Sequence, residues 1–239
     1  MPGAPVPADA GPQVEPIGER ALLLRFGHRI DRAVNARVHA AGRAVQQAAL
    51  PGVHDIVPTY AVLALHYDPA AWAAGDGKTA PWQRLAAAVR RILSKVPAGV
   101  ADALRSVDIP VQYGGTAGPD IDAVARHAGL ETAEIIRRHC AGEYRVAMLG
   151  FAPGFAYLIG LDPALHTPRH ATPRIRVPAG SVAIGGAQTG IYPRTLPGGW
   201  QIIGRTQAVL FDPLRDPPSL LAAGDRVRFV ALDADAIDA

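Results

Sequence analysis

The spacing of hydrophobic positions in the first half of the chain predicts strands and helices in succession. The apolar run at residues 21–27 predicts a buried strand that ends at a glycine. From residue 34 to residue 48, apolar side chains recur at spacings of four and three, which predicts an amphipathic helix. Asp31 is expected to cap this helix, and Pro51 with Gly52 is expected to stop it.

Two further alternating runs, residues 53–57 and 60–67, predict antiparallel strands, and a second amphipathic helix is expected to begin at Pro81. Alternation resumes at Val107, Ile109 and Val111, which predicts a fourth strand. The order strand, helix, strand, strand, helix, strand is that of the split βαβ arrangement. We therefore expect an α+β domain over residues 14–112, preceded by a flexible tail at residues 1–13 that is rich in proline, glycine and alanine.

The second half of the chain follows a different pattern. The segment QYGGTAGPD, residues 112–120, has the composition of a linker, so a domain boundary is expected between residues 112 and 113. Short helices are predicted from Asp120 and from Glu131. Short strands follow at residues 144–148, 182–184, 190–192, 200–203, 208–211 and 226–230. Many short strands with glycine corners are typical of a closed β-barrel or a sandwich, here over residues 113–239.

Composition adds several exclusions. The 239 residues include 24 basic and 21 acidic side chains, a net charge of +3 without a run of like charge, so no nucleic-acid partner is expected. A single cysteine, Cys140, excludes an internal disulfide framework and is typical of a reducing compartment. The first fourteen residues lack the features of a secretory signal, and no apolar run approaches the roughly 20 residues that span a bilayer. The sequence thus predicts a cytoplasmic protein without a membrane partner.

Arginine is concentrated in the second half of the chain. Residues 141–211 contain six arginines and no lysine, and only Glu143 and Asp162 oppose them. The six are Arg145, Arg169, Arg174, Arg176, Arg194 and Arg205. Because a guanidinium group presents a planar fork of donors to a carboxylate or phosphate, arginines on a rigid β surface indicate an anionic ligand. The alternative is a solvated surface whose charge other segments balance.

The sequence shows no autonomous catalytic machinery. No GxxxxGK[ST] loop is present, and the glycine-rich segments do not open a predicted helix, so the chain is not expected to bind ATP or a dinucleotide by itself. His166 and His170 flank a proline and are expected in a loop, so no metal site is predicted. His139 adjoins Cys140, but successive helical residues diverge by about 100°, so the two form no catalytic pair. His139 and Tyr144 are candidates for polar groups that line a site, with a packing role as the alternative.

Several long blocks of the sequence resemble a known family. They are HCAGEYRVAMLGFAPGFAYLIGL, PRHATPRIRVPAGSVAIGGAQTGIYPRTLPGGWQIIGRT and LLAAGDRVRF, together with IGERALLLRFG near the N-terminus and VDIPVQYGG at the predicted junction. They resemble the 5-oxoprolinase B subunit, a family also called allophanate hydrolase subunit 1 and the KipI kinase-inhibitor family. The resemblance implies a ferredoxin-like N-terminal domain and a cyclophilin-like C-terminal β-barrel. It also implies a homologous 5-oxoprolinase C subunit and a separate A subunit as partners, with ATP shared among the subunits, in the opening of 5-oxoproline to glutamate.

This resemblance suggests roles for particular residues. The anion-binding candidates are Arg169, Arg174, Arg194 and Arg205, with Gln188 and Tyr192 as further polar groups; His139 and Tyr144 would orient the reacting group; and Gly150, Gly154, Gly198 and Gly199 would let the backbone approach the ligand. The alternatives are that the glycines only turn corners and that the glutamine and tyrosine satisfy buried backbone groups. Two other functions stay open: a KipI-like inhibitor of a sensor histidine kinase, and the carboxyltransferase half of a biotin-dependent urea or amide carboxylase.

Overall fold

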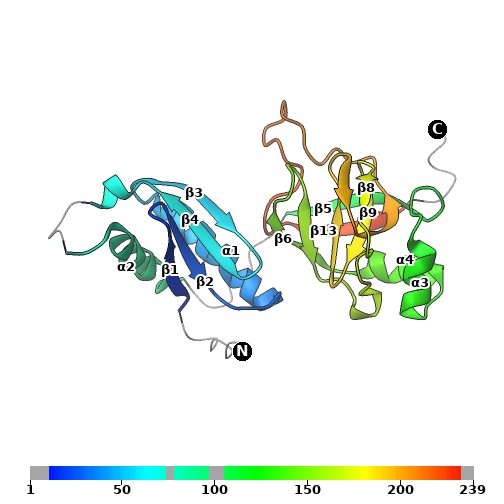
Figure 1. Ribbon diagram of the computed structural model, residues 1–239, viewed down its shortest axis with the longest axis horizontal. Coiled ribbons are helices and arrows are strands. Elements are labelled where there is room, and N and C mark those ends of the chain that lie inside the picture. The colour runs from blue at the N-terminus through cyan, green and yellow to red at the C-terminus, as the bar shows by residue number, and fades with distance from the viewer. Residues whose placement is uncertain (1–10, 74–77, 97–104, 233–239) are drawn as a thin grey trace. The chain divides into compact units, whose positions relative to one another are not determined.

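The computed structural model describes residues 11–73, 78–96 and 105–232, which form two compact units, Met1–Asp102 and Ala103–Ala239 (Figure 1). The helices are α1 (Arg32–Ala48), α2 (Pro81–Leu93), α3 (Ile121–Ala128) and α4 (Thr132–Ala141), with short 3-10 helices η1 (Pro69–Trp72) and η2 (Pro163–Leu165). The strands are β1 (Gln13–Ile17), β2 (Ala21–Arg25), β3 (Val53–Pro58), β4 (Val62–Tyr67), β5 (Ser106–Tyr113), β6 (Tyr144–Leu149), β7 (Ala156–Ile159), β8 (Arg174–Val177), β9 (Ser181–Gly185), β10 (Gln188–Ile191), β11 (Leu196–Gly198), β12 (Gln201–Arg205) and β13 (Arg226–Ala231).

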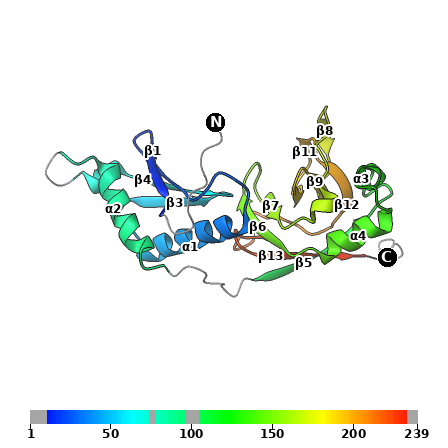
Figure 2. The same cartoon turned by 90° about the horizontal axis from the view of Figure 1, so that it is seen from below.

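The N-terminal unit is a four-stranded antiparallel sheet with α1 and α2 on one face (Figure 2). Its strand order is β1-β2-β4-β3, and alternate residues of β2 and β4 are buried against the two helices. Asp31 caps α1 as predicted, since its Oδ1 accepts a hydrogen bond from the Val34 amide at 2.8 Å. Pro81 begins α2, also as predicted, because the first helical position needs no amide donor.

One edge strand of this sheet differs from the prediction. The position beside β2 is occupied by β1, which the hydrophobic pattern does not predict, because its exposed residues and Pro16 give no alternation. The strand that contains Val107, Ile109 and Val111 is β5, which pairs with β12 and β13 in the C-terminal unit. Its assignment to the N-terminal sheet was wrong because hydrophobic alternation predicts a strand without identifying its partner.

The predicted domain ranges, 14–112 and 113–239, therefore differ from the observed units by the β5 segment. Most of the predicted flexible tail at residues 1–13 falls on residues 1–10, which lie outside the described residues, and Gln13 already belongs to β1. The chain thus combines a mixed α/β N-terminal unit with a barrel to which β5 contributes.

The C-terminal unit is built around a closed barrel of seven strands, which confirms the predicted barrel. Its strand order is β10-β7-β6-β13-β5-β12-β9, and pairing of β9 with β10 closes it. The β5–β13 pair is parallel. The interior is filled by alternate strand residues such as Ile109, Val146 and Phe229, while α3 and α4 pack beside β12 and β13. The two-stranded sheet of β8 and β11 lies outside the barrel order.

The segment at residues 112–120 is part of the barrel unit and not a linker. The Gly114 amide donates to the Ile203 carbonyl at 3.1 Å, and the Asp120 amide donates to the Ile202 carbonyl at 2.9 Å. These bonds attach the segment to β12. Its glycines allow two backbones to pack closely. A glycine-rich composition is the same for such a packed segment and for a hinge, so the sequence does not tell them apart.

Several strand predictions in this unit need correction. The predicted strand at residues 208–211 contributes only an isolated bridge between Phe211 and Ser219. In contrast, β7, β8 and β11 were not predicted, because glycine and proline interrupt the hydrophobic pattern around them. The helices predicted from Asp120 and Glu131 are present as α3 and α4.

Candidate functional site

Arginine and aromatic side chains meet on the outer wall of the barrel around Trp200. A Cβ atom at Gly185 of β9 would lie 2.5 Å from the indole, so a glycine is needed for Trp200 to pack directly on this strand. The Arg169 guanidinium carbon lies 5.5 Å from the Trp200 ring centroid, within the range of a cation–π interaction. We call the following residues the arginine–aromatic cluster: Tyr157, Arg169, Arg174, Tyr192 and Trp200.

Tyr192 is a buried member of this cluster and is close to both arginines. Burial raises the pKa of Tyr192, whereas a backbone hydrogen bond with Trp200 and the positive charges of Arg169 and Arg174 offset part of that rise. A Cβ atom at Gly198 would overlap the Tyr192 hydroxyl group, so the predicted site glycine provides space for a side chain here. Two of the predicted arginines and Tyr192 are therefore brought together.

Arg174 is held in place by Asp120, a residue predicted only as the start of a helix. Arg174 Nη2 donates to Asp120 Oδ1 at 2.6 Å, and the Ile202 amide donates to Asp120 Oδ2 at 2.7 Å. Burial by itself would raise the pKa of Asp120, but the hydrogen bonds from Arg174, Ile202 and His170 outweigh it, so the pKa is lowered. Asp120 is thus a buried carboxylate that links α3 to β8 and β12.

Two glutamines lie near the cluster. Gln188 is buried in β10 opposite Gly185, and this register places its side chain on the outer face of the barrel, the face that Trp200 covers. Gln201 Nε2 donates to the Pro168 carbonyl at 2.9 Å, while its buried Oε1 has no hydrogen-bond partner within the described part of the chain. An unsatisfied buried acceptor costs about 1–3 kcal/mol. Gln201 is therefore a candidate ligand-binding group, next to the segment that carries Arg169. No sequence pattern identified it.

His139 and Tyr144 lie in the barrel interior and not in the cluster. His139 Nδ1 is 2.7 Å from the Tyr113 hydroxyl, and Nε2 is 3.0 Å from Thr189 Oγ1. The Tyr144 hydroxyl donates to the His139 carbonyl at 2.9 Å. Burial lowers the pKa of His139 to about 3 and raises the pKa of Tyr144. These positions agree with the packing alternative, and a catalytic role for the pair stays a prediction.

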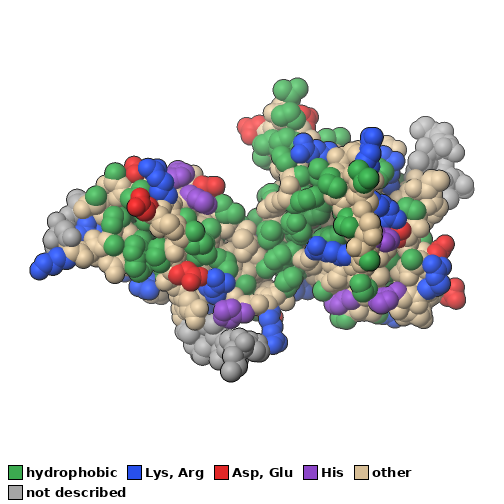
Figure 3. Space-filling model, in the orientation of Figure 1, with side chains coloured by type: hydrophobic (Ala, Val, Ile, Leu, Met, Phe, Trp, Pro, Cys, Tyr) green, Lys and Arg blue, Asp and Glu red, His purple; other side chains and the backbone are tan. Residues whose placement is uncertain are grey.

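The other two predicted arginines lie outside the cluster. Arg205 is exposed at the end of β12, where its Nε donates to the Ala179 carbonyl at 3.1 Å. Arg194 is exposed after β10. On the face of the C-terminal unit that Figure 3 shows, arginine side chains are interspersed with hydrophobic ones. The structure therefore does not join all four candidate arginines into one site.

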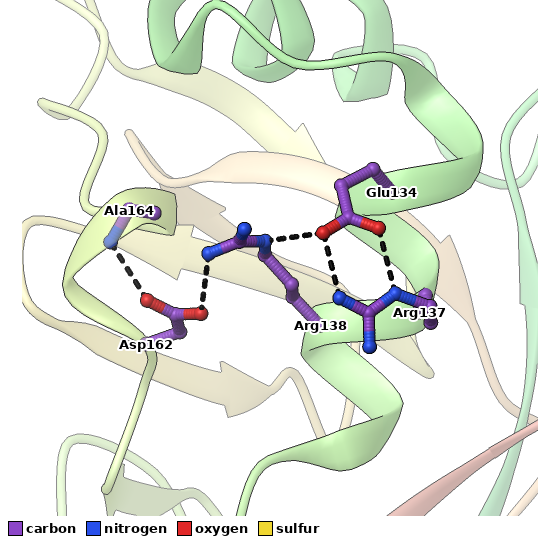
Figure 4. Close-up of polar contacts among 5 residues, drawn as sticks. All are labelled: Glu134, Arg137, Arg138, Asp162 and Ala164. Atoms are coloured by element: carbon purple, nitrogen blue, oxygen red, sulfur yellow. Dashed lines mark hydrogen bonds and ion pairs between the residues drawn. The ribbon is translucent and has the colours of Figure 1, made fainter.

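The strongly shifted carboxylate of Glu134 belongs to a structural ion-pair network. Its oxygens accept hydrogen bonds from Arg137 at 2.6 and 2.7 Å and from Arg138 at 2.7 Å, and Arg138 also contacts Asp162 at 3.1 Å (Figure 4). The bonds from Arg137 and Arg138 lower the pKa of Glu134 to about 2. Asp162 in turn caps η2 by accepting from the Ala164 amide. The network fastens α4 to the segment between β7 and η2, which accounts for the shifted pKa without a catalytic role.

Neither a metal-ligand group nor a membrane-spanning helix is found among the described residues. Within residues 11–73, 78–96 and 105–232, no group of three or more His, Cys, Asp or Glu is arranged to hold a metal ion. His170 Nε2 lies 2.8 Å from Arg174 Nη1 and 3.3 Å from Asp120 Oδ2, so this histidine joins the Asp120 contacts. No helix in the same ranges is long and apolar enough to cross a membrane.

The predicted site glycines differ in how much space surrounds them. Gly199 makes a backbone contact, since its carbonyl accepts from the His170 amide at 2.7 Å. Gly154 has a φ of +80°, and a Cβ atom there would lie 2.7 Å from Phe211 Cβ, whereas the nearest atom to a Cβ at Gly150 is Met148 Cε at 3.7 Å. Gly154 is therefore required by the fold itself.

We expect Gly154→Ala to lower the free energy of unfolding by about 2–4 kcal/mol, because both the left-handed backbone and the close contact oppose a methyl group. Gly150→Ala is the matched control and should change it by less than about 1 kcal/mol. Urea denaturation followed by tryptophan fluorescence measures both. Equal stability of the two variants would contradict a structural requirement at Gly154.

The cluster offers exposed positive charge for binding an anion. Arg169 is exposed and Arg174 is half-buried, so an anion can reach guanidinium donors beside an aromatic surface. Its five members include no pair of nucleophile and general base. The arrangement is therefore suited to binding an anion.

Comparison with known proteins identifies the family. The family model for the carboxyltransferase domain, subdomain C and D, matches residues 12–221. The chain is 41% identical over 222 residues to the 5-oxoprolinase B subunit of Bacillus subtilis, covering 92% of each protein. The crystal structure of TTHA0988 is similar with a TM-score of 0.75 and 41% identity over 90% of this chain, although the chain covers only 40% of that protein. The protein PH0987 from Pyrococcus horikoshii is 39% identical, with a TM-score of 0.54, and the match covers 93% of this chain and 98% of PH0987. The chain therefore belongs to the carboxyltransferase-domain family of subdomains C and D, together with the proteins named as B subunits of 5-oxoprolinase.

Proposed function

We propose that this chain is the B subunit of an ATP-dependent 5-oxoprolinase, which converts 5-oxo-L-proline, ATP and water to L-glutamate, ADP and phosphate. The proposal includes a homologous C subunit, with which the chain forms a shared active site, a separate A subunit, and a cytoplasmic location. It also includes two domains, a ferredoxin-like N-terminal domain and a cyclophilin-like C-terminal barrel. The names of the similar proteins support it.

The single structural observation that carries the proposal is the exposed Arg169 guanidinium on Trp200, beside Arg174. A five-membered lactam resists water because its amide is resonance-stabilised. Phosphoryl transfer from ATP to the amide oxygen would release ADP and weaken the ring amide. Water would then add to the activated ring carbon and the carbon–nitrogen bond would break, and hydrolysis of the resulting acyl phosphate would release glutamate and inorganic phosphate. Fixed guanidinium groups would stabilise the negative charge of the phosphate. Since the chain has no GxxxxGK[ST] loop, the proposal assigns the main ATP contacts to the partner subunits.

Reconstitution tests this proposal directly. The chain, mixed with the purified A and C subunits, is expected to release glutamate from 5-oxo-L-proline in the presence of ATP, and each component by itself is expected to be inactive. Omission of this chain should abolish the activity. Unchanged glutamate release without it would refute the proposal.

In the reconstituted enzyme, Arg169→Gln is expected to reduce kcat/KM by roughly 10- to 100-fold, because one charge-assisted hydrogen bond to an anion is lost. Arg126→Gln on α3 is the matched control, an exposed arginine outside the cluster, and should leave kcat/KM unchanged. Steady-state assays of glutamate release provide the comparison. An equal effect of both substitutions would show that Arg169 has no specific role.

A second function has support from the family model itself, which describes a carboxyltransferase domain. In that case the chain would be half of a biotin-dependent urea or amide carboxylase. Transfer of a carboxyl group from a biotinylated carrier, with no glutamate formed from 5-oxoproline, would favour it over the first proposal. Inhibition of a sensor histidine kinase stays a prediction from the sequence.

A further inference from the structure

A cavity on the outer face of the barrel lies beside β5 and β12 and shares no lining residue with the arginine–aromatic cluster. Its volume is about 620 Å³, in the middle of the range for small-molecule sites. Residues from β5, from the turn before β9 and from the segment after β12 surround it. The cavity is therefore large enough for a metabolite-sized ligand.

Arg205 and Gln112 form a pair on the wall of this cavity. They lie directly opposite each other in the antiparallel pairing of β12 with β5, so their side chains leave the same face of the sheet. That face is the outer one, because the flanking Val111 is fully buried in the barrel core. The register thus places a guanidinium group and a carboxamide side by side, with Cβ atoms about 5 Å apart.

The Arg205 side chain is oriented but keeps free donors. Its Nε donates to the Ala179 carbonyl at 3.1 Å, which directs the guanidinium group along the cavity wall. Its terminal nitrogens Nη1 and Nη2 make no hydrogen bond or ion pair with the described residues. Gln112 is half-buried, and its side-chain carboxamide makes no such contact with these residues either. These groups can therefore bind a ligand without first breaking an internal contact.

The remaining walls supply apolar contact without competing charge. Pro110, Ala179 and Pro193 contribute apolar surface, and none of the residues that line the cavity is Asp or Glu. A cation without a neighbouring carboxylate favours an anionic ligand. One guanidinium group suits one carboxylate, and the carboxamide suits a neutral amide.

We propose that this cavity binds a small monocarboxylate that carries an amide or lactam group, with the carboxylate on Arg205 and the amide on Gln112. The inference rests on the proposed function, because 5-oxo-L-proline carries one carboxylate and one lactam amide. The substrate carboxylate then binds Arg205 and not the arginine–aromatic cluster. The arginine–aromatic cluster then remains for the phosphate-bearing or partner groups.

Three probes separate the parts of this proposal by NMR titration of the full-length ¹⁵N-labelled chain. They are 5-oxo-L-proline, 2-pyrrolidinone, which lacks the carboxylate, and cyclopentanecarboxylate, which lacks the amide. The first is expected to shift the amide signals of Gly180, Thr206 and Ala208 saturably and to bind at least about 10-fold more tightly than either analogue. No saturable shift, or shifts confined to the residues around Trp200, would overturn the proposal.

Substitutions test the two contacts independently. Arg205→Gln is expected to weaken 5-oxo-L-proline at least about 10-fold, to the level of 2-pyrrolidinone, and Gln112→Leu to weaken 5-oxo-L-proline but not cyclopentanecarboxylate. Arg126→Gln, outside the cavity, is the control and should bind 5-oxo-L-proline like the unaltered chain. Dispersed amide spectra report that each variant is folded. Undiminished binding by folded Arg205→Gln would refute the assignment.

The reconstituted enzyme distinguishes failure of this inference from failure of the proposed function. If Arg205→Gln removes ligand binding but the unaltered complex releases no glutamate, the cavity assignment holds and the 5-oxoprolinase proposal fails. If the unaltered complex is active and Arg205→Gln leaves its KM for 5-oxo-L-proline unchanged, the proposed function holds and the cavity assignment fails.

Discussion

Asp120→Ala is expected to lower the free energy of unfolding by about 2–4 kcal/mol, because it leaves the Ile202 amide and the Arg174 guanidinium without their acceptor. Asp120 is 6% exposed, so water cannot replace the carboxylate at the Ile202 amide without rearrangement. Since Asp120 also orients Arg174, the variant should bind anions at the arginine–aromatic cluster more weakly. Urea denaturation gives the stability, and NMR titration with inorganic phosphate gives the change in anion affinity.

Asp122→Ala supplies the control for this effect. Asp122 lies two positions further along, in the first turn of α3, and accepts one exposed hydrogen bond from Thr132 at 3.1 Å. Its substitution should change stability by less than about 0.5–1 kcal/mol. Asp120→Asn should be intermediate, because its amide oxygen still accepts from Ile202 while the charge opposite Arg174 is gone. If Asp120→Ala is as stable as Asp122→Ala, Asp120 does not fasten the barrel wall as described.

Acidification is expected to destabilise the chain through His139 by about 2–3 kcal/mol between pH 6 and pH 4. Burial lowers the pKa of His139 from 6.5 to about 3, so the unfolded chain binds a proton there in a pH range where the folded chain does not. The stability associated with the neutral imidazole is therefore fully present above pH 6.5 and is lost as the pH falls towards 3. Urea denaturation at a series of pH values measures this slope.

A direct titration separates His139 from the acidic groups. The lowered pKa values of Asp108, Asp120 and Glu134 also make folding less favourable in acid, but their effect begins only near pH 5, about one pH unit above the usual carboxyl pKa values of 3.8 to 4.5. The His139 imidazole signals, followed by NMR in the folded chain, should remain those of the neutral ring down to about pH 4. Protonation of His139 near pH 6 in the folded chain would contradict the prediction.

The candidate site was only partly accessible from the sequence. The concentration of arginine in residues 141–211 indicated an anion-binding surface, and the structure does bring Arg169 and Arg174 near Tyr192. It places Arg205 on a cavity away from that cluster, however, because residues on different strands meet according to barrel register and not according to sequence distance. Asp120 and Gln201 were not identified, since their importance depends on partners from β8, β12 and the loop at Pro168.

The sequence by itself determined the local elements of this protein. The capping of α1 by Asp31, the start of α2 at Pro81 and the strand character of β5 follow from interactions within a few residues, which periodicity and residue type report directly. Only the tertiary structure decided that β5 belongs to the barrel, that Asp120 pairs with Arg174 at a separation of 54 residues, and that His139 lies inside the core. Such contacts depend on which surfaces pack together, and a hydrophobic pattern shows that a side chain is buried without showing what it is buried against.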